Sequence, residues 1–153
     1  MVQDTDEIDK RLLRALQKDA TPSVETLAET VHLSRNACWR RIKRMEETGL
    51  IRGRVALLDA ERLGFGLAVF VMVRATEHSA DWLGTFRQTV RAMPEITGAY
   101  RMSGELDYLL KVQVDSVKSY DRFYQRLVSK IKAADISASF VMEEIKETTE
   151  LPV

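Results

Sequence analysis

Two helical segments separated by a tight turn constrain the fold of the first third of this chain most strongly. Residues 24–31 carry apolar side chains at helical spacing, and the sequence "HLS" at residues 32–34 interrupts them. Ser34 is a favourable N-cap for a longer helix that ends near Gly49. A short helix, a tight turn and a longer helix predict a helix-turn-helix, preceded by another helix over residues 6–16.

Positive charge is concentrated on the longer helix and the residues after it. The chain has 23 basic and 23 acidic residues, but residues 34–54 contain seven basic and two acidic ones. Such a local excess is expected of a surface that binds anions. The alternative is a basic helix surface that is merely solvated. The position of the charges on the second helix of a helix-turn-helix favours DNA.

The longer helix has a buried side and a polar side. At about 100° per residue, Cys38, Ile42 and Met45 lie on one stripe, which predicts the buried side. In a helix-turn-helix the N-terminal part of the second helix meets base edges in the major groove. The candidates for base contacts are Arg35, Asn36, Trp39 and Arg40, although Trp39 has the alternative of packing against a neighbouring helix.

The remaining DNA-binding candidates surround these residues. Lys43 and Arg44 lie one turn further along the helix, where phosphates are the expected partners, and Ser34 stands at its N-terminus. Residues 50–59 alternate weakly between apolar and polar side chains, which predicts a wing strand that carries Arg52. The first domain is therefore predicted to be a winged helix-turn-helix.

A change of apolar period after residue 60 predicts a second domain. The expected elements are a strand over residues 67–73, a helix over 79–93, strands over 95–102 and 107–114, a helix with its apolar stripe between 120 and 131, and a strand over 137–147. The order β-α-β-β-α-β is the ferredoxin-like arrangement, with both helices on one face of an antiparallel sheet. We expect an α+β protein with domains at residues 1–60, linker included, and 61–153.

Composition excludes several other classes of protein. Cys38 is the only cysteine, so an internal disulfide and a cysteine-built metal cage are excluded. His32 and His78 lack neighbouring ligands, and we predict neither a metal site nor a cofactor. The longest apolar run has seven residues, against roughly 20 for a membrane span. With a polar N-terminus in addition, the expectation is a cytoplasmic protein that binds no membrane.

The predicted architecture and four segments resemble the leucine-responsive regulatory protein/AsnC (Lrp/AsnC) family. These segments are "DEIDKRLLRALQKD", "LAETVHLSRNACWRRIKRMEETGLIRG", "ITGAYRMSGELDYLLKV" and "EEIKETTELPV". The resemblance implies a sequence-specific transcriptional regulator that binds double-stranded DNA. It also implies a homodimer formed through the sheet of the second domain, assembly into larger rings that are commonly octamers, and a small effector between dimers, usually an amino acid.

Under this resemblance, the loop "YRMSGELD" is the expected effector site. Gly104 would let a ligand approach backbone N–H groups, and Asp107 would supply a charge for an α-ammonium group. Further candidates are Tyr100 and Met102 as walls of the pocket, and Ser137 and Ser139 contributed by a neighbouring chain. The alternative is a plain hairpin turn in which the glycine and the aspartate serve turn geometry alone.

Two other functions are compatible with the same fold. An architectural protein would compact DNA with little sequence preference, and its low specificity ratio over competitor DNA would distinguish it. Some decarboxylases of tetrapyrrole biosynthesis resemble this family, so the fold alone does not decide against catalysis. No pair of acid and base residues stands out in the sequence, and we therefore predict that the protein is not an enzyme.

Overall fold

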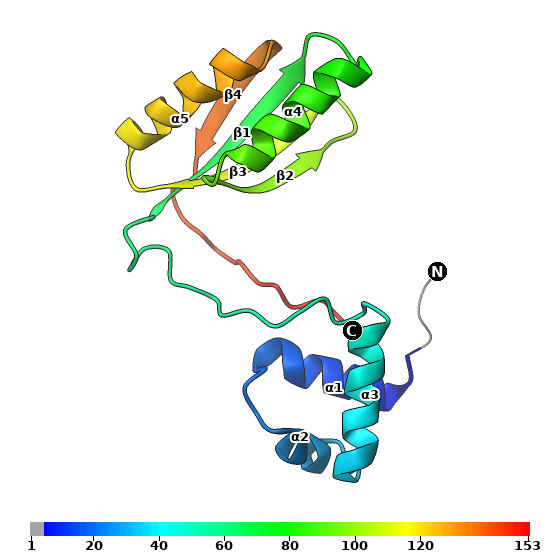
Figure 1. Cartoon of the computed structure of the whole chain (residues 1–153). Helices are drawn as coiled ribbons and strands as arrows, with labels where there is room; N and C mark the ends of the chain where they lie inside the picture. The colour runs from blue at the N-terminus through cyan, green and yellow to red at the C-terminus, as the bar shows by residue number, and fades with distance from the viewer. Residues whose placement is uncertain (1–4) are drawn as a thin grey trace. The chain divides into compact units, whose positions relative to one another are not determined.

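A computed structural model describes residues 5–153, which form two compact units (Figure 1). One unit contains the chain up to Leu57 together with Lys146–Val153, and the other is Leu58–Ile145. The C-terminal segment belongs with the first unit because it bonds to the first helix. Arg14 Nε donates to the carbonyl of Val153 over 2.5 Å, and Gln17 exchanges two hydrogen bonds with the backbone of Leu151.

The first unit contains three helices, each with a polar N-cap. They are α1 (Glu7–Lys18), α2 (Val24–Thr30) and α3 (Arg35–Glu47), with Asp6, Ser23 and Ser34 as the caps. Each cap side chain accepts a hydrogen bond from a backbone N–H of the first turn, which the helix itself leaves without a partner. The predicted helix-turn-helix of α2 and α3 is confirmed.

These three helices bury one small apolar core. Its fully buried members are Leu12, Leu27, Ala28, Val31, Cys38, Ile42 and Met45. The stripe of α3 predicted to be buried is therefore confirmed. Burial raises the pKa of the Cys38 thiol, so this side chain stays protonated and acts as a small apolar residue.

The predicted wing strand is wrong, because residues 50–58 form no strand. A strand needs a ladder partner, and every ladder in the described residues joins strands of the second unit. The chain instead closes α3: Gly49 takes a left-handed φ of +76°, and the N–H of Ile51 donates to the carbonyl of Met45 over 2.9 Å. Arg52 thus lies on an exposed irregular segment.

The second unit is a four-stranded antiparallel sheet with two helices. The elements are β1 (Leu67–Ala75), α4 (Ala80–Ala92), β2 (Ile96–Arg101), β3 (Tyr108–Val114), α5 (Val117–Lys130) and β4 (Ala133–Phe140). The strand order is β2-β3-β1-β4, and α4 and α5 cover the same face (Figure 1). The predicted α+β class and ferredoxin-like order are confirmed.

The last strand lies earlier in the chain than the predicted 137–147, because β4 begins at Ala133 and ends at Phe140. Residues 141–147 lie outside it. The ladder with β1 fixes this span. Phe140 pairs with Val69 at one end of the ladder, and Ala133 pairs with Ala75 at the other. Residues beyond Phe140 extend past this ladder, which explains why a pattern of apolar residues alone misplaced the strand.

Alternation along the two central strands gives the sheet one covered and one open face. Val69, Val71 and Val73 of β1 are fully buried, as are the alternate residues of β3. The intervening residues Phe70 and Met72 are only partly buried, because both described helices lie on the other face. None of the described helices is long and apolar enough to cross a membrane.

The N-cap of α1 makes the first unit sensitive to acid. The backbone N–H of Asp9, and then the Arg41 guanidinium, hold the pKa of the Asp6 carboxyl below its ordinary value of 3.8. A depressed folded-state pKa stabilises the fold above the unfolded-state pKa, and this contribution disappears as the pH falls through the folded-state value. Wild type should therefore be more stable than Asp6→Ala at pH 7, and the gap should shrink below pH 3.8.

Urea unfolding of both proteins between pH 7 and pH 2.5, followed by circular dichroism, measures this gap. A gap that stays constant over the whole range would show that the charge of Asp6 does not stabilise the first unit.

Candidate DNA-binding and effector sites

The N-terminal half of α3 exposes the four residues predicted to contact bases. They are Arg35, Asn36, Trp39 and Arg40. None of the four side chains has a hydrogen-bond or ion-pair partner among residues 5–153. Trp39 is 53% exposed, so it is not packed against a neighbouring helix of its own unit. A planar guanidinium, an amide and an indole are thus presented together on one helix surface.

The other residues predicted to bind DNA are also at the surface, and Ser34 and Lys43 make only weak contacts within the chain. The Ser34 hydroxyl accepts the N–H of Ala37 over 3.3 Å and keeps its own O–H free to donate. Lys43 Nζ lies 3.9 Å from a carboxylate oxygen of Glu47, an exposed pair one turn apart. Such pairs contribute little to stability, so Lys43 remains available for another anion.

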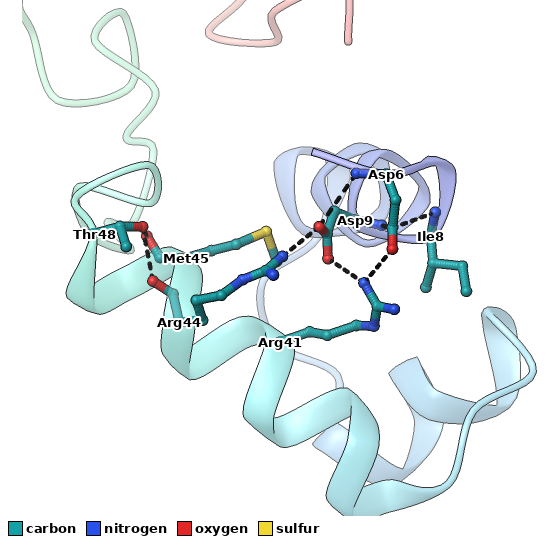
Figure 2. Close-up of polar contacts among 7 residues, drawn as sticks. All are labelled: Asp6, Ile8, Asp9, Arg41, Arg44, Met45 and Thr48. Atoms are coloured by element: carbon teal, nitrogen blue, oxygen red, sulfur yellow. Dashed lines mark hydrogen bonds and ion pairs between the residues drawn. The ribbon is translucent and has the colours of Figure 1, made fainter. Parts of the chain in front are cut away.

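Arg44, the other phosphate candidate, is held by a network between α1 and α3 that was not predicted (Figure 2). The side chain of Asp9 is 2% exposed, and its two oxygens accept from different arginines. One oxygen accepts from Arg41 Nη1 over 2.9 Å, and the other accepts from Arg44. Arg41 Nη1 also donates to Asp6 over 2.7 Å. The Arg44 side chain is half exposed, so its other guanidinium nitrogens remain able to donate to a further partner.

This network divides the arginines of α3 into two groups. Arg41 and Arg44 are bonded to α1, and Arg35 and Arg40 are not. Hydrogen bonds to Asp9 and Asp6 raise the pKa of Arg41, which keeps it charged and attached to α1. The sequence contained a signal for this role, because Arg41 follows Cys38 by three positions and precedes Met45 by four. It therefore borders the buried stripe, whereas Arg40 points to the opposite side of the helix.

The predicted effector loop joins β2 to β3. The Met102 N–H donates to the carbonyl of Asp107 over 2.8 Å and closes the loop, while Gly104 adopts a φ of +110° that favours glycine. Tyr100 and Met102 are both exposed. Tyr100 lies back over Gly98, since a Cβ on that glycine would stand 2.8 Å from the tyrosine Oη.

Asp107 already has a structural partner within the domain. Its Oδ2 accepts the backbone N–H of Ala75 over 2.8 Å, at the bulge that ends β1. Its Oδ1 lies 3.7 Å from His78 Nε2, a contact that becomes an ion pair only when the imidazole is protonated. One oxygen of Asp107 is thus bonded to β1, and the other is left to a ligand or to His78.

The two predicted serines lie far from this loop within one chain. Ser137 pairs with Met72, Met72 with Leu109, and Leu109 with Tyr100. This cross-strand row runs from one edge strand of the sheet to the other, so Ser137 and Tyr100 are separated by three strand spacings, roughly 14 Å. Ser139 lies two residues further along β4. Any site shared with the loop therefore requires serines from another chain.

Among residues 5–153, no group of three or more histidine, cysteine or acidic side chains is arranged so that it could hold a metal ion. The predicted sites lie at two exposed features of the described chain, the surface of α3 and the loop between β2 and β3. One suits nucleic acid, and the other suits a small ligand.

Both units match models of known protein families. Residues 6–46 match the AsnC-type helix-turn-helix domain, and residues 68–151 match the Lrp/AsnC ligand binding domain. The chain belongs to the Lrp/AsnC family. It is thus a DNA-binding transcriptional regulator with a helix-turn-helix unit and a ligand-binding unit.

Similar proteins resemble this Lrp/AsnC protein over nearly their whole length. The glutamate uptake regulatory protein of Zymomonas mobilis is 49% identical, over 100% of this chain and 93% of its own. The DNA-binding transcriptional activator DecR of Escherichia coli is 48% identical, over 97% and 98%. An AsnC family transcriptional regulator from Agrobacterium tumefaciens, solved by crystallography, shares 49% identity with a TM-score of 0.94 over 97% of each chain.

The Asp9 network should contribute strongly to the packing of α1 on α3. In Asp9→Ala, Arg41 and Arg44 lose a buried acceptor, and we expect a loss of roughly 2 kcal/mol. The local free energy of opening, measured by hydrogen exchange of the amides of α1 and α3, reports this loss separately from the second unit. Glu47→Gln is the matched control, because its exposed pair with Lys43 should contribute less than about 0.5 kcal/mol.

Equal protection from exchange in wild type and Asp9→Ala would show that the network does not hold the two helices together.

Proposed function

We propose that this Lrp/AsnC regulator reads base edges with Arg35, Asn36, Trp39 and Arg40 of α3. The observation that carries the proposal is the absence of any partner for these four side chains within residues 5–153, next to arginines that α1 holds firmly. Unpaired guanidinium and amide groups keep all their donors for guanine or adenine. An exposed indole adds apolar contact area for a thymine methyl group.

Phosphate contacts position this helix in the groove. Ser34, Lys43, Arg44 and Arg52 surround the base-reading residues and are all exposed. Arg44 keeps nitrogens beyond the one that Asp9 binds, so it is able to reach a phosphate while it stays attached to α1. The buried pairing limits the conformations open to Arg44, which lowers the entropy cost of the contact.

The protein acts as a homodimer that assembles further into an octamer. The open sheet face, with Phe70, Met72 and Leu109, is a surface that a second copy would cover. The exposed apolar side chains Val55 and Leu57 before β1 are also suited to a second copy. A dimer presents two recognition helices to successive major grooves.

The reducing cytoplasm is the working compartment, in keeping with an unpaired cysteine.

The effector is an amino acid held at the loop between β2 and β3. A Neisseria meningitidis transcriptional regulator solved in complex with L-Met is 34% identical, with a TM-score of 0.93 over 97% of each chain. The Asp107 Oδ1 atom would accept the α-ammonium group, and the backbone near Gly104 would bind the α-carboxylate. Tyr100 and Met102 would line the side-chain pocket, with Ser137 and Ser139 of a neighbouring chain across from them.

Arg40 and Lys43 should affect DNA binding in different ways. Arg40→Ala removes a bidentate donor for a base, so the affinity for the cognate site should fall by about tenfold or more, with relaxed sequence preference. Lys43→Ala removes a phosphate contact, so binding should weaken equally on all sequences and the salt slope should fall by about one.

Sites selected from random DNA, followed by gel-shift titrations at several salt concentrations, separate the two effects. If Arg40→Ala keeps the full ratio of specific to non-specific affinity, Arg40 does not read a base. A wild-type protein with no such ratio would be an architectural DNA-compacting protein instead.

Asp107→Asn tests the ammonium contact without removing the hydrogen bond from Ala75. The asparagine carbonyl still accepts the N–H of Ala75, but the negative charge is lost. We expect affinity for the effector to fall about 10- to 100-fold, the range for a hydrogen bond to a charged group. A thermal-shift screen of the twenty amino acids identifies the effector, because a ligand of the native state raises its apparent stability.

Asp107→Ala serves as the comparison, since it removes both the negative charge and the acceptor of the Ala75 N–H. If Asp107→Asn binds the effector as wild type does, the α-ammonium group lies elsewhere. If no amino acid stabilises wild type, the effector is of another class.

A further inference from the structure

A cavity lies in the second unit, between α4 and the edge strand β2. Its volume is about 310 Å³, which suits a small organic molecule. The floor is apolar and aromatic, with Phe86 and Val90 from α4, Ala99 from β2 and Tyr108 from β3. Tyr100, a wall of the proposed amino-acid pocket, also lines it, whereas Met102, Gly104 and Asp107 do not. The two proposed sites therefore adjoin at Tyr100 and otherwise use different residues.

Three arginines surround this floor. Arg87 and Arg91 are one turn apart on α4, and Arg101 ends β2 on the face that the helices cover, opposite Tyr108 in the ladder. All three are exposed, and none has a hydrogen-bond or ion-pair partner among residues 5–153. No acidic side chain is among the cavity-lining residues. The cavity therefore carries three positive charges that nothing in the described chain neutralises.

Another cavity of the second unit, lined mainly by residues of α5 and the end of β3, shows the ordinary arrangement of charges. There Arg126 is paired with Glu95, Arg122 donates to Ser119 over 2.6 Å, and two aspartates share the lining. Its charges are largely balanced within the protein, as is usual for a solvated surface. The cavity beside β2 differs because its charge is of one sign and its floor is aromatic.

We propose that the cavity between α4 and β2 binds a small organic dicarboxylate. Arg87 and Arg91 would bind one carboxylate and Arg101 the other, through the paired N–H groups that guanidinium presents to carboxylate. The short carbon chain between the carboxylates would lie on Phe86 and Val90. A dianion gains more than a monoanion from three arginines, so the site selects dicarboxylates over monocarboxylic acids of the same length.

The position of Arg101 links this site to the effector loop. Arg101 is the last residue of β2 and directly precedes Met102. A bound dicarboxylate would fix the end of the strand from which the loop departs. The amino-acid site and the dicarboxylate site would then be coupled, and the coupling free energy would be the same in both directions.

The test uses the full-length protein with 2-oxoglutarate as the dicarboxylate probe. The monocarboxylate control is 2-oxopentanoate, which has the same chain length, and inorganic phosphate is a dianion of different shape. We expect 2-oxoglutarate to raise the melting temperature and to bind in calorimetry with at least about tenfold higher affinity than either control. The double variant Arg87→Gln/Arg91→Gln should lose at least about tenfold of this affinity. Lys118→Gln, which removes an exposed cation of α5 outside the cavity, should not change it.

Asp107→Asn separates this proposal from the amino-acid site, because that variant should still bind 2-oxoglutarate. Three results would overturn the proposal. The first is equal binding of phosphate, which would identify a general anion site. The second is 2-oxoglutarate binding that is equally strong in wild type and in the double variant, or that is absent from both. The third is a double variant that loses DNA affinity while wild type binds no dicarboxylate, since the arginines would then lie along the path of DNA.

Discussion

The buried carboxylate of Asp9 accepts hydrogen bonds from both Arg41 and Arg44, and this interaction fixes α3 against α1. Removing a carboxylate from water is costly unless both oxygens are paired, so Arg41 and Arg44 are both bonded to α1, while the Arg44 side chain stays half exposed. The other polar side chains of α3 are left on the opposite side, where Arg40 is exposed. One acidic residue on α1 thus binds two of the arginines of α3, while Arg35 and Arg40 have no partner in residues 5–153.

The second unit follows from a different constraint, the alternation of side chains along the central strands. Val69, Val71 and Val73 fill one face, which α4 and α5 cover, and a shift of one residue in the register would move all three to the open face. The same alternation leaves Phe70 and Met72 partly exposed. The second unit of a single chain therefore completes its own core on one face of the sheet. On the other face it offers an apolar surface that suits an oligomer.

Sequence periodicity predicted the helices, the β-α-β-β-α-β order and the buried stripe of α3, because each depends on contacts that repeat at a fixed spacing. It failed where structure depends on a specific partner. Residues 50–58 have no ladder partner in the described chain, and β4 is limited by its pairing with β1. The Asp9 network escaped prediction because a carboxylate in the first turn of a helix also fits a simple capping role.

At the proposed effector loop, a ligand contact would compete with a structural contact for Asp107. Asp107 holds the last amide of β1 through one oxygen and leaves the other toward His78. A ligand that draws the carboxylate away from Ala75 would have to offset a hydrogen bond of about 1 kcal/mol. A ligand that uses only the free oxygen leaves that bond intact. In the first case effector binding would loosen the end of β1, and in the second it would rigidify the loop, so the two modes of binding at Asp107 would have opposite effects on this strand end.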